Sequence, residues 1–79
     1  MRRNSEADTI RREKLIAYRK NMGLTLEQVG KELGITYPAY SLIENGKSAS
    51  MKLWRKIQYF FQIPSSEMWE IINPDLEEV

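Results

Sequence analysis

The 79-residue sequence contains no cysteine and no histidine. It therefore offers no disulfide, no thiolate zinc site, no cysteine nucleophile and no imidazole general base. It also has no Gly-rich phosphate loop, and no pair of carboxylates stands in a recognisable pocket-forming context. We therefore expect no metal, no cofactor and no enzymatic activity.

Long apolar runs are absent as well. None approaches the roughly 18 residues of a membrane span, and the first residues contain no apolar signal core. Strand patterns, repeats and low-complexity tracts are also missing. A chain of 79 residues makes one domain, near the lower limit at which an apolar core alone can hold a fold. We expect a soluble cytoplasmic protein that does not contact a membrane.

Apolar residues recur at helical spacing in five segments, which predicts an all-α fold. The helices are expected over residues 8–22, 25–33, 36–44, 51–62 and 65–72. Their buried faces are expected to include Ile10, Lys14, Leu15, Tyr18, Met22, Val29, Leu33, Thr36, Tyr40, Ile43, Leu53, Trp54, Ile57, Phe60, Phe61, Met68, Trp69, Ile71 and Ile72. Bulky residues dominate the fourth segment, so this helix should form one wall of the core.

The second and third helices are separated by a very short turn. Thr25 is a good N-cap for the first of them, and Gly34 tolerates the left-handed conformation that ends a helix. Thr36 caps the next helix, which has Pro38 in its first turn and ends at Asn45-Gly46. Two short helices joined in this way must cross steeply, which is the layout of a DNA-reading helix-turn-helix.

The net charge of only +1 hides a strong segregation of charge along the chain. The net charge is +4 over residues 1–22, −2 over 23–44, +4 over 45–62 and −5 over 63–79. The second basic block directly follows the expected reading helix. Local field governs the attraction of phosphates more than total charge does, so this block favours nucleic acid as a partner. The alternative is that these charges only solvate the helices.

The chain resembles the phage-repressor/Cro-like family of helix-turn-helix proteins, also called the Xre family. The resemblance rests on Leu15 through Arg19, Gly23-Leu24-Thr25, the small residue Gly30 and the run Ile43-Glu44-Asn45-Gly46-Lys47. It covers roughly residues 11 to 72 and implies a five-helix repressor-like bundle with the helix-turn-helix at helices 2 and 3. We divide the chain into a flexible basic arm (1–7), a DNA-binding domain (8–72) and an acidic tail (73–79).

Angular positions at about 100° per residue divide the third helix into two faces. With Tyr40 inward, Ile43 and Thr36 also point inward, whereas the outward positions include Pro38 and Leu42. Together with positions implied by the resemblance, the expected DNA-binding residues are Thr36, Tyr37, Pro38, Ser41, Leu42, Asn45, Lys47 and Lys52.

Three of these positions depart from the family pattern. Positions matching Tyr37, Pro38 and Leu42 often hold residues that make two-pronged hydrogen bonds to adenine or guanine, and none of the three can do so. The Tyr37 hydroxyl can still reach a base or phosphate, and Leu42 can lie against a thymine methyl group, which favours A·T-containing sites. Alternatively, Tyr37 is a plain surface aromatic, and Leu42 packs internally or contacts a protein.

The resemblance also implies phosphate contacts and a structural ion pair. Asn45, Lys47 and Lys52 match backbone-clamping positions, although Asn45 can equally serve only to end its helix. Leu26 stands where the family commonly has a phosphate-binding glutamine, with Gln28 two places further on. Separately, Arg19 and Glu44 match a partly buried ion pair that ties helix 1 to the end of helix 3; the alternative is two unrelated surface charges.

Two functions remain open at this stage. The first is a transcription regulator of phage or bacterial kind, repressor-like, that binds operator duplex as a homodimer and is nucleoid-associated through DNA. The second is an antitoxin-like or antirepressor-like module that uses Tyr37, Pro38 and Leu42 on a protein partner. Aromatic residues next to basic ones also suggest single-strand stacking, but core packing is the better explanation for Trp54, Phe60 and Trp69. Any aromatic left exposed can contribute to a dimer face.

Overall fold

The computed structural model describes residues 11–73, and this part of the chain folds into five α-helices without a strand. The helices are α1 (Glu13–Asn21), α2 (Leu26–Leu33), α3 (Tyr37–Glu44), α4 (Met51–Phe61) and α5 (Ser65–Ile72). This confirms the predicted all-α, five-helix fold. The expected arm (1–7) and all but the first residue of the acidic tail (73–79) lie outside the described residues.

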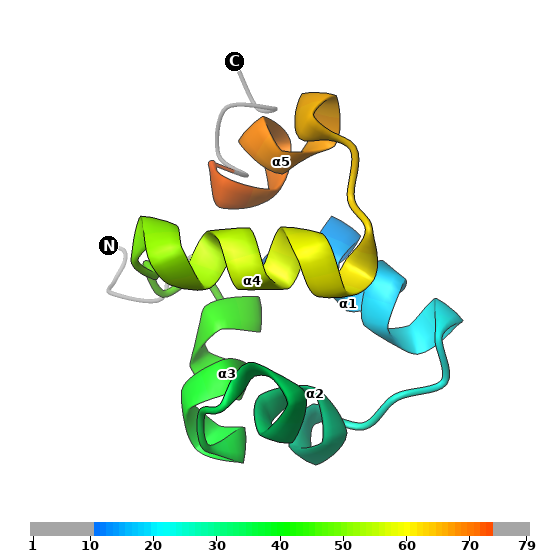
Figure 1. Ribbon diagram of the computed structural model, residues 1–79, viewed down its shortest axis with the longest axis vertical. Coiled ribbons are helices and arrows are strands. Elements are labelled where there is room, and N and C mark those ends of the chain that lie inside the picture. The colour runs from blue at the N-terminus through cyan, green and yellow to red at the C-terminus, as the bar shows by residue number, and fades with distance from the viewer. Residues whose placement is uncertain (1–10, 74–79) are drawn as a thin grey trace, which may run out of the picture.

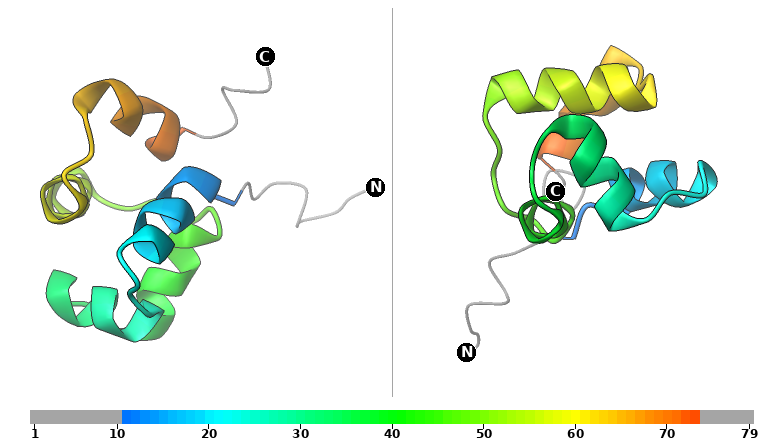
Figure 2. Two further views of the ribbon diagram at one scale, coloured as in Figure 1. Left: turned by 90° about the vertical axis from the view of Figure 1, so that its right-hand side faces the viewer. Right: turned by 60° about the horizontal axis from the view of Figure 1, so that its bottom comes forward.

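Helix α4 crosses the middle of the molecule. Figure 1 shows α5 above it and the α2–α3 pair below it. The first view of Figure 2, along α4, shows α1 beside α3 on the other side of the bundle. The helices therefore surround one core, and α2 and α3 form the lower end of the molecule.

The starts of α2 and α3 confirm the sequence-based predictions, because each has the expected cap, and α4 is capped in the same way by Ser50. The side-chain oxygens of Thr25, Thr36 and Ser50 each accept a hydrogen bond from the backbone amide three residues further on, at 3.1–3.2 Å. Gly34 ends α2 in the left-handed conformation, with φ 79°. These capping groups satisfy amides that a helix end otherwise leaves without partners.

The start of the first helix was predicted wrongly. Helix α1 begins at Glu13, and neither Arg11 nor Arg12 is helical. The expected helical residues Asp8 to Ile10 lie outside the described residues, and Lys14, expected on the buried face, is exposed. Arg12 has φ −89° and ψ 77°, and this conformation turns its side chain into the bundle. Met22 was also placed wrongly: it caps the end of α1 and is 49% exposed.

Most of the predicted core is buried. The buried apolar cluster consists of Leu15, Val29, Leu33, Tyr40, Ile43, Trp54, Ile57, Phe61, Ile63, Met68 and Ile71, and Phe60 packs against it partly buried. Trp69 was predicted to be buried, and this prediction was wrong, since the residue is 64% exposed. Met68 and Ile71 define the buried side of the short helix α5, and Trp69 lies about 100° around the helix from Met68.

Thr36 was also predicted to point into the core, and this prediction was wrong, since the residue is exposed. The angular prediction treated it as a helical residue, whereas it is the N-cap of α3 with φ −76° and ψ 158°. Its hydroxyl turns back to accept from the Ala39 amide instead of entering the core.

Gln62 ends α4 in the left-handed region, with φ 56°. This conformation turns the chain so that the next residue, Ile63, is buried and donates its amide to the Gln58 carbonyl at 3.0 Å. A side chain strains such a backbone and glycine does not. Gln62→Gly should therefore raise the free energy of unfolding, measured in urea, by about 0.5–1 kcal/mol. Gln62→Ala is the matched control and should give no gain; a gain from alanine as well would show that the strain is not the cause.

Candidate nucleic-acid interface

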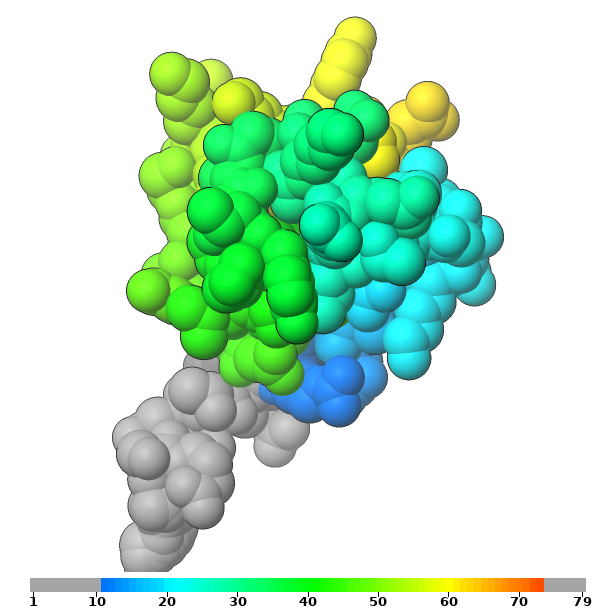
Figure 3. Space-filling model, turned by 90° about the horizontal axis from the view of Figure 1, so that it is seen from below, coloured from blue at the N-terminus to red at the C-terminus, as the bar shows by residue number. Residues whose placement is uncertain are grey.

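Helices α2 and α3 lie side by side on one face of the molecule. Figure 3 shows this face from below, with α3 in green beside α2 in blue-green and the segment after α3 at the edge. The turn between them is tight: a Cβ atom on Gly30 would stand 3.0 Å from the Ile35 carbonyl oxygen and 3.2 Å from that of Thr36. The Ile35 amide donates to the Gly30 carbonyl at 2.9 Å. The turn into α3 thus packs directly against the backbone of α2.

Helix α3 has a buried and an exposed side. Tyr40, Ile43 and Glu44 are buried. The exposed side carries Tyr37, Pro38, Ser41 and Leu42, which we call the reading face; Tyr37 and Leu42 are each about half exposed, at 52% and 50%. The structure therefore leaves large apolar side chains on the surface of α3, with only Ser41 and the Tyr37 hydroxyl offering polar atoms there.

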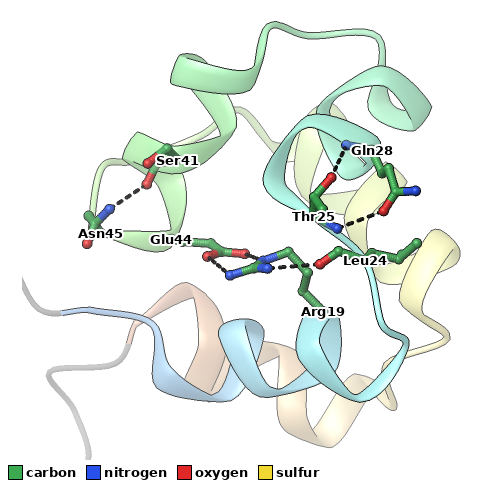
Figure 4. A network of polar contacts seen from close by, with 7 residues as sticks. All are labelled: Arg19, Leu24, Thr25, Gln28, Ser41, Glu44 and Asn45. Atoms are coloured by element: carbon green, nitrogen blue, oxygen red, sulfur yellow. Dashed lines mark hydrogen bonds and ion pairs between the residues drawn. The ribbon is translucent and has the colours of Figure 1, made fainter.

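The segment from residue 45 to 50, which we call the contact loop, follows the reading face directly. Asn45 and Lys47 are exposed in it, and Lys52 is exposed in the first turn of α4. Figure 4 shows the Asn45 side-chain amide donating to the Ser41 carbonyl, at 2.8 Å. Lysine ammonium groups beside the free amides of a helix start form an arrangement that suits phosphate oxygens.

Two further basic residues extend this region, and the sequence interpretation did not single them out as contacts. Arg55 and Lys56 are exposed on α4, one turn beyond Lys52. Within residues 11–73, neither they nor the two lysines form an ion pair. The net positive charge of residues 45–62 is the sequence feature that could have indicated Arg55 and Lys56. The charges of all four cations are available to an external anion.

The start of α2 offers fewer side-chain groups for binding phosphate than the resemblance implies for the family. Leu26 packs partly buried against the core, so its side chain cannot bind phosphate. The Gln28 carbonyl oxygen accepts from the Thr25 amide at 2.8 Å, which completes a reciprocal cap (Figure 4). Of the Gln28 side chain, the amino group remains available to an outside acceptor.

Arg19 and Glu44 are brought together between α1 and the end of α3. Arg19 Nε donates to Glu44 Oε2 at 2.7 Å and Nη2 donates to Oε1 at 3.2 Å, while Nη1 donates to the Leu24 carbonyl at 2.9 Å (Figure 4). The side chains are 13% and 4% exposed. The hydrogen bond to Glu44 raises the pKa of Arg19. This pair fixes the carboxyl end of α3 against α1.

Tyr40 lies beside this ion pair and is fully buried. Burial raises the pKa of Tyr40, and the charge of Glu44 raises it further, so the hydroxyl stays neutral. Among the described residues the hydroxyl oxygen has no hydrogen-bond partner. The Glu44 carboxylate lies close enough to act on the hydroxyl, and the ring serves packing, as predicted.

Arg12 is the buried polar residue that sequence reasoning missed. It is 4% exposed and bonds to backbone carbonyls at the ends of α3 and α5. An arginine next to the exposed Arg11, in a strongly charged stretch, carries no sequence signal for burial.

A depression of about 430 Å³ lies between α1 and α5. Lys14 pairs there with Glu70, and the Tyr18 hydroxyl donates to Glu67 at 2.6 Å, which raises the pKa of Tyr18. These polar groups already satisfy one another, so we assign the depression no chemistry. In residues 11–73 no cluster of side chains is suited to hold a metal ion. No helix in that range is long and apolar enough to cross a membrane.

Comparison with known proteins agrees with this geometry. A family model described as helix-turn-helix matches residues 15–68, more than half of the chain. Neither the comparison with curated proteins nor that with solved structures found a match. The matched range contains α2, α3, the contact loop and the Arg19–Glu44 pair. The chain therefore belongs to the Xre/Cro-like helix-turn-helix family of DNA-binding regulators.

Proposed function

We propose that this protein is a repressor-like transcription regulator that places α3 in the major groove of an operator. The main support for the proposal is the exposed reading face, followed at once by cations that have no carboxylate partner within residues 11–73. A helix in the major groove needs one face free for base edges and phosphate contacts on its flank to fix its register. Lys47 and Lys52 supply that flank, with Arg55 and Lys56 beyond them.

The reading face points to a particular kind of site. Leu42 can rest against a thymine methyl group, and the Tyr37 hydroxyl can bond to a base edge or a phosphate. No side chain of the reading face makes a bidentate contact with guanine or adenine. Recognition should therefore favour A·T-containing sequences and depend strongly on phosphate contacts.

We further propose that the protein binds as a homodimer. Trp69, an aromatic residue 64% exposed on α5, supports this, because an aromatic side chain of that size is a common anchor of protein interfaces. A two-fold dimer would read half-sites about 34 Å apart, one turn of the duplex. The operator should then be an inverted repeat.

Selection of duplexes from a random pool, at two salt concentrations, tests the proposal. Phosphate attraction weakens steeply with salt, whereas base recognition persists as a preference among the retained sequences. We expect an enriched inverted repeat that contains A·T pairs at both salt concentrations. Weak, salt-sensitive retention without a motif would contradict operator binding.

The apolar character of the reading face also favours a second function, a protein-interaction module of antitoxin-like or antirepressor-like kind. Tyr37 and Leu42 leave an exposed apolar surface of the kind that protein partners cover. In that case the random pool yields no motif and the partner binds at Leu42.

Leu42→Asp separates the two functions. If α3 reads DNA, affinity for the selected site should fall about 10-fold or more, because one base contact is worth about 1–3 kcal/mol, while weak general affinity for duplex remains. Fluorescence anisotropy with the selected and a scrambled duplex measures both. Tyr59→Asp is the matched control: it adds the same charge at an 88% exposed aromatic on α4 and should leave the preference intact. An unchanged preference in Leu42→Asp would contradict a base contact at this position.

A further inference from the structure

We propose that Arg12 is the positioning residue of the contact loop, and that it makes the conformation of this loop depend on the docking of α5. The inference rests on the proposed function, because it takes Lys47 as a contact to DNA phosphate. It concerns a side chain outside the helix-turn-helix that touches no part of the reading face.

One side of the Arg12 guanidinium holds the end of α3 and the contact loop. Nη1 donates to the Ile43 carbonyl at 2.7 Å and to the Lys47 carbonyl at 2.8 Å. The backbone amide of Arg12 adds a bond to the Glu44 carbonyl, at 2.8 Å. The Ile43 carbonyl also accepts from the Gly46 amide, so Arg12 adds a long-range donor to a helix end that local bonds already cap.

The other side of the same guanidinium holds the end of α5. Nε donates to the Ile71 carbonyl at 2.7 Å and Nη2 to the Ile72 carbonyl at 3.0 Å. Because the guanidinium is planar and rigid, these acceptors and those of α3 and the loop have fixed relative positions. A displacement of the end of α5 must therefore disturb the carbonyl of Lys47.

Among the described residues, the side chain of Arg12 bonds to backbone carbonyls, and its surroundings favour the charged form of the guanidinium. Its guanidinium carbon lies 4.8 Å from the centre of the Trp54 ring, in a cation–π contact. Burial lowers the pKa of Arg12, but an arginine stays protonated in proteins. The partial negative charge at two helix ends takes the place of a carboxylate.

Lys47 has few other constraints on its backbone. Its amide donates to the Leu42 carbonyl at 3.0 Å, and the preceding amide, of Gly46, donates to the Ile43 carbonyl at 3.1 Å. Among the described residues, Arg12 is the donor to the Lys47 carbonyl. Loss of this donor should free the loop while leaving α2, α3 and their crossing in place.

Arg12→Lys in the full chain tests the proposal, because lysine keeps the charge but cannot span both sets of carbonyls. Amide hydrogen exchange, followed by NMR, should speed up about 10-fold or more at Gly46 and Lys47, and also at Asn73, whose amide bonds to the Trp69 carbonyl at the end of α5. Affinity for duplex should fall about 10-fold, and the salt dependence should weaken by about one phosphate contact. The neighbouring substitution Arg11→Lys is the control and should change none of these quantities.

Faster exchange spread evenly over all helices, with unchanged salt dependence, would overturn the positioning role and leave only a structural one. Faster exchange at the loop without a change at Asn73 would overturn the link to α5. If the unmodified protein binds no duplex, operator binding fails, whereas the exchange comparison still decides the role of Arg12. The unmodified protein provides a further check should Arg12→Lys not fold: the Arg12 guanidinium protons should give separate NMR signals, and a freely rotating guanidinium would overturn the proposal.

Discussion

Arg19→Met should lower the free energy of unfolding by about 3–5 kcal/mol, the loss expected when one partner of a buried ion pair is removed. Glu44 is 3% exposed and accepts two hydrogen bonds from Arg19. Methionine fills much of the same volume but leaves the carboxylate buried without its cation. It also leaves the Leu24 carbonyl, which leads into α2, without its donor. Urea unfolding followed by circular dichroism measures the loss.

Two further variants test whether the unpaired charge of Glu44 causes the loss of stability. The double variant Arg19→Met with Glu44→Leu should recover most of the stability, because it removes the stranded charge as well. Arg11→Met is the matched control on an exposed arginine, 3.8 Å from Glu13, which is also exposed, and should change stability by less than about 0.5 kcal/mol. A loss below about 1 kcal/mol in the single variant would mean that water reaches Glu44 and that the pair does not hold α3 in place.

The double variant Lys47→Glu with Lys52→Glu should lower affinity for duplex about 100-fold or more near 100 mM salt. Each reversal removes a cation that has no carboxylate partner in residues 11–73 and places an anion against the phosphates. The salt dependence of binding should weaken by about two phosphate contacts. Anisotropy titrations over a range of salt concentrations measure both effects.

The control for this variant changes the net charge equally at a different place. Lys20 and Lys31 are exposed on α1 and α2, outside residues 36–52. Their replacement by glutamate should weaken binding far less, since local field dominates over net charge. Equal losses in the two double variants would contradict a phosphate-contacting surface at the contact loop and the start of α4.

The helix-turn-helix was predictable from sequence because its signals are local. The caps Thr25 and Thr36, and the terminator Gly34, act through bonds to neighbouring residues or through the conformation of one residue. Such effects hold in almost any surroundings. The family resemblance added the Arg19–Glu44 pair, which residue spacing alone does not reveal.

The positions that the sequence misplaced depend on distant parts of the chain. Trp69 looks like a core residue by composition, yet Met68 and Ile71 already fill the side of α5 that faces the bundle. Arg12 looks like a surface charge, but its acceptors lie 31 to 60 residues away in the chain. Periodicity counts apolar residues, so it cannot find a buried cation that is satisfied by backbone carbonyls. The DNA contacts themselves remain predictions.

The close approach at Gly30 determines which partner must adapt when the protein meets DNA. No side chain separates the turn from α2 at Gly30, so the start of α3 has little room to shift relative to α2. A stiff recognition unit meets a duplex whose stiffness varies from one base step to the next. Much of the discrimination between operators should then arise from the energy needed to bend or narrow the DNA, at base pairs that the protein never touches.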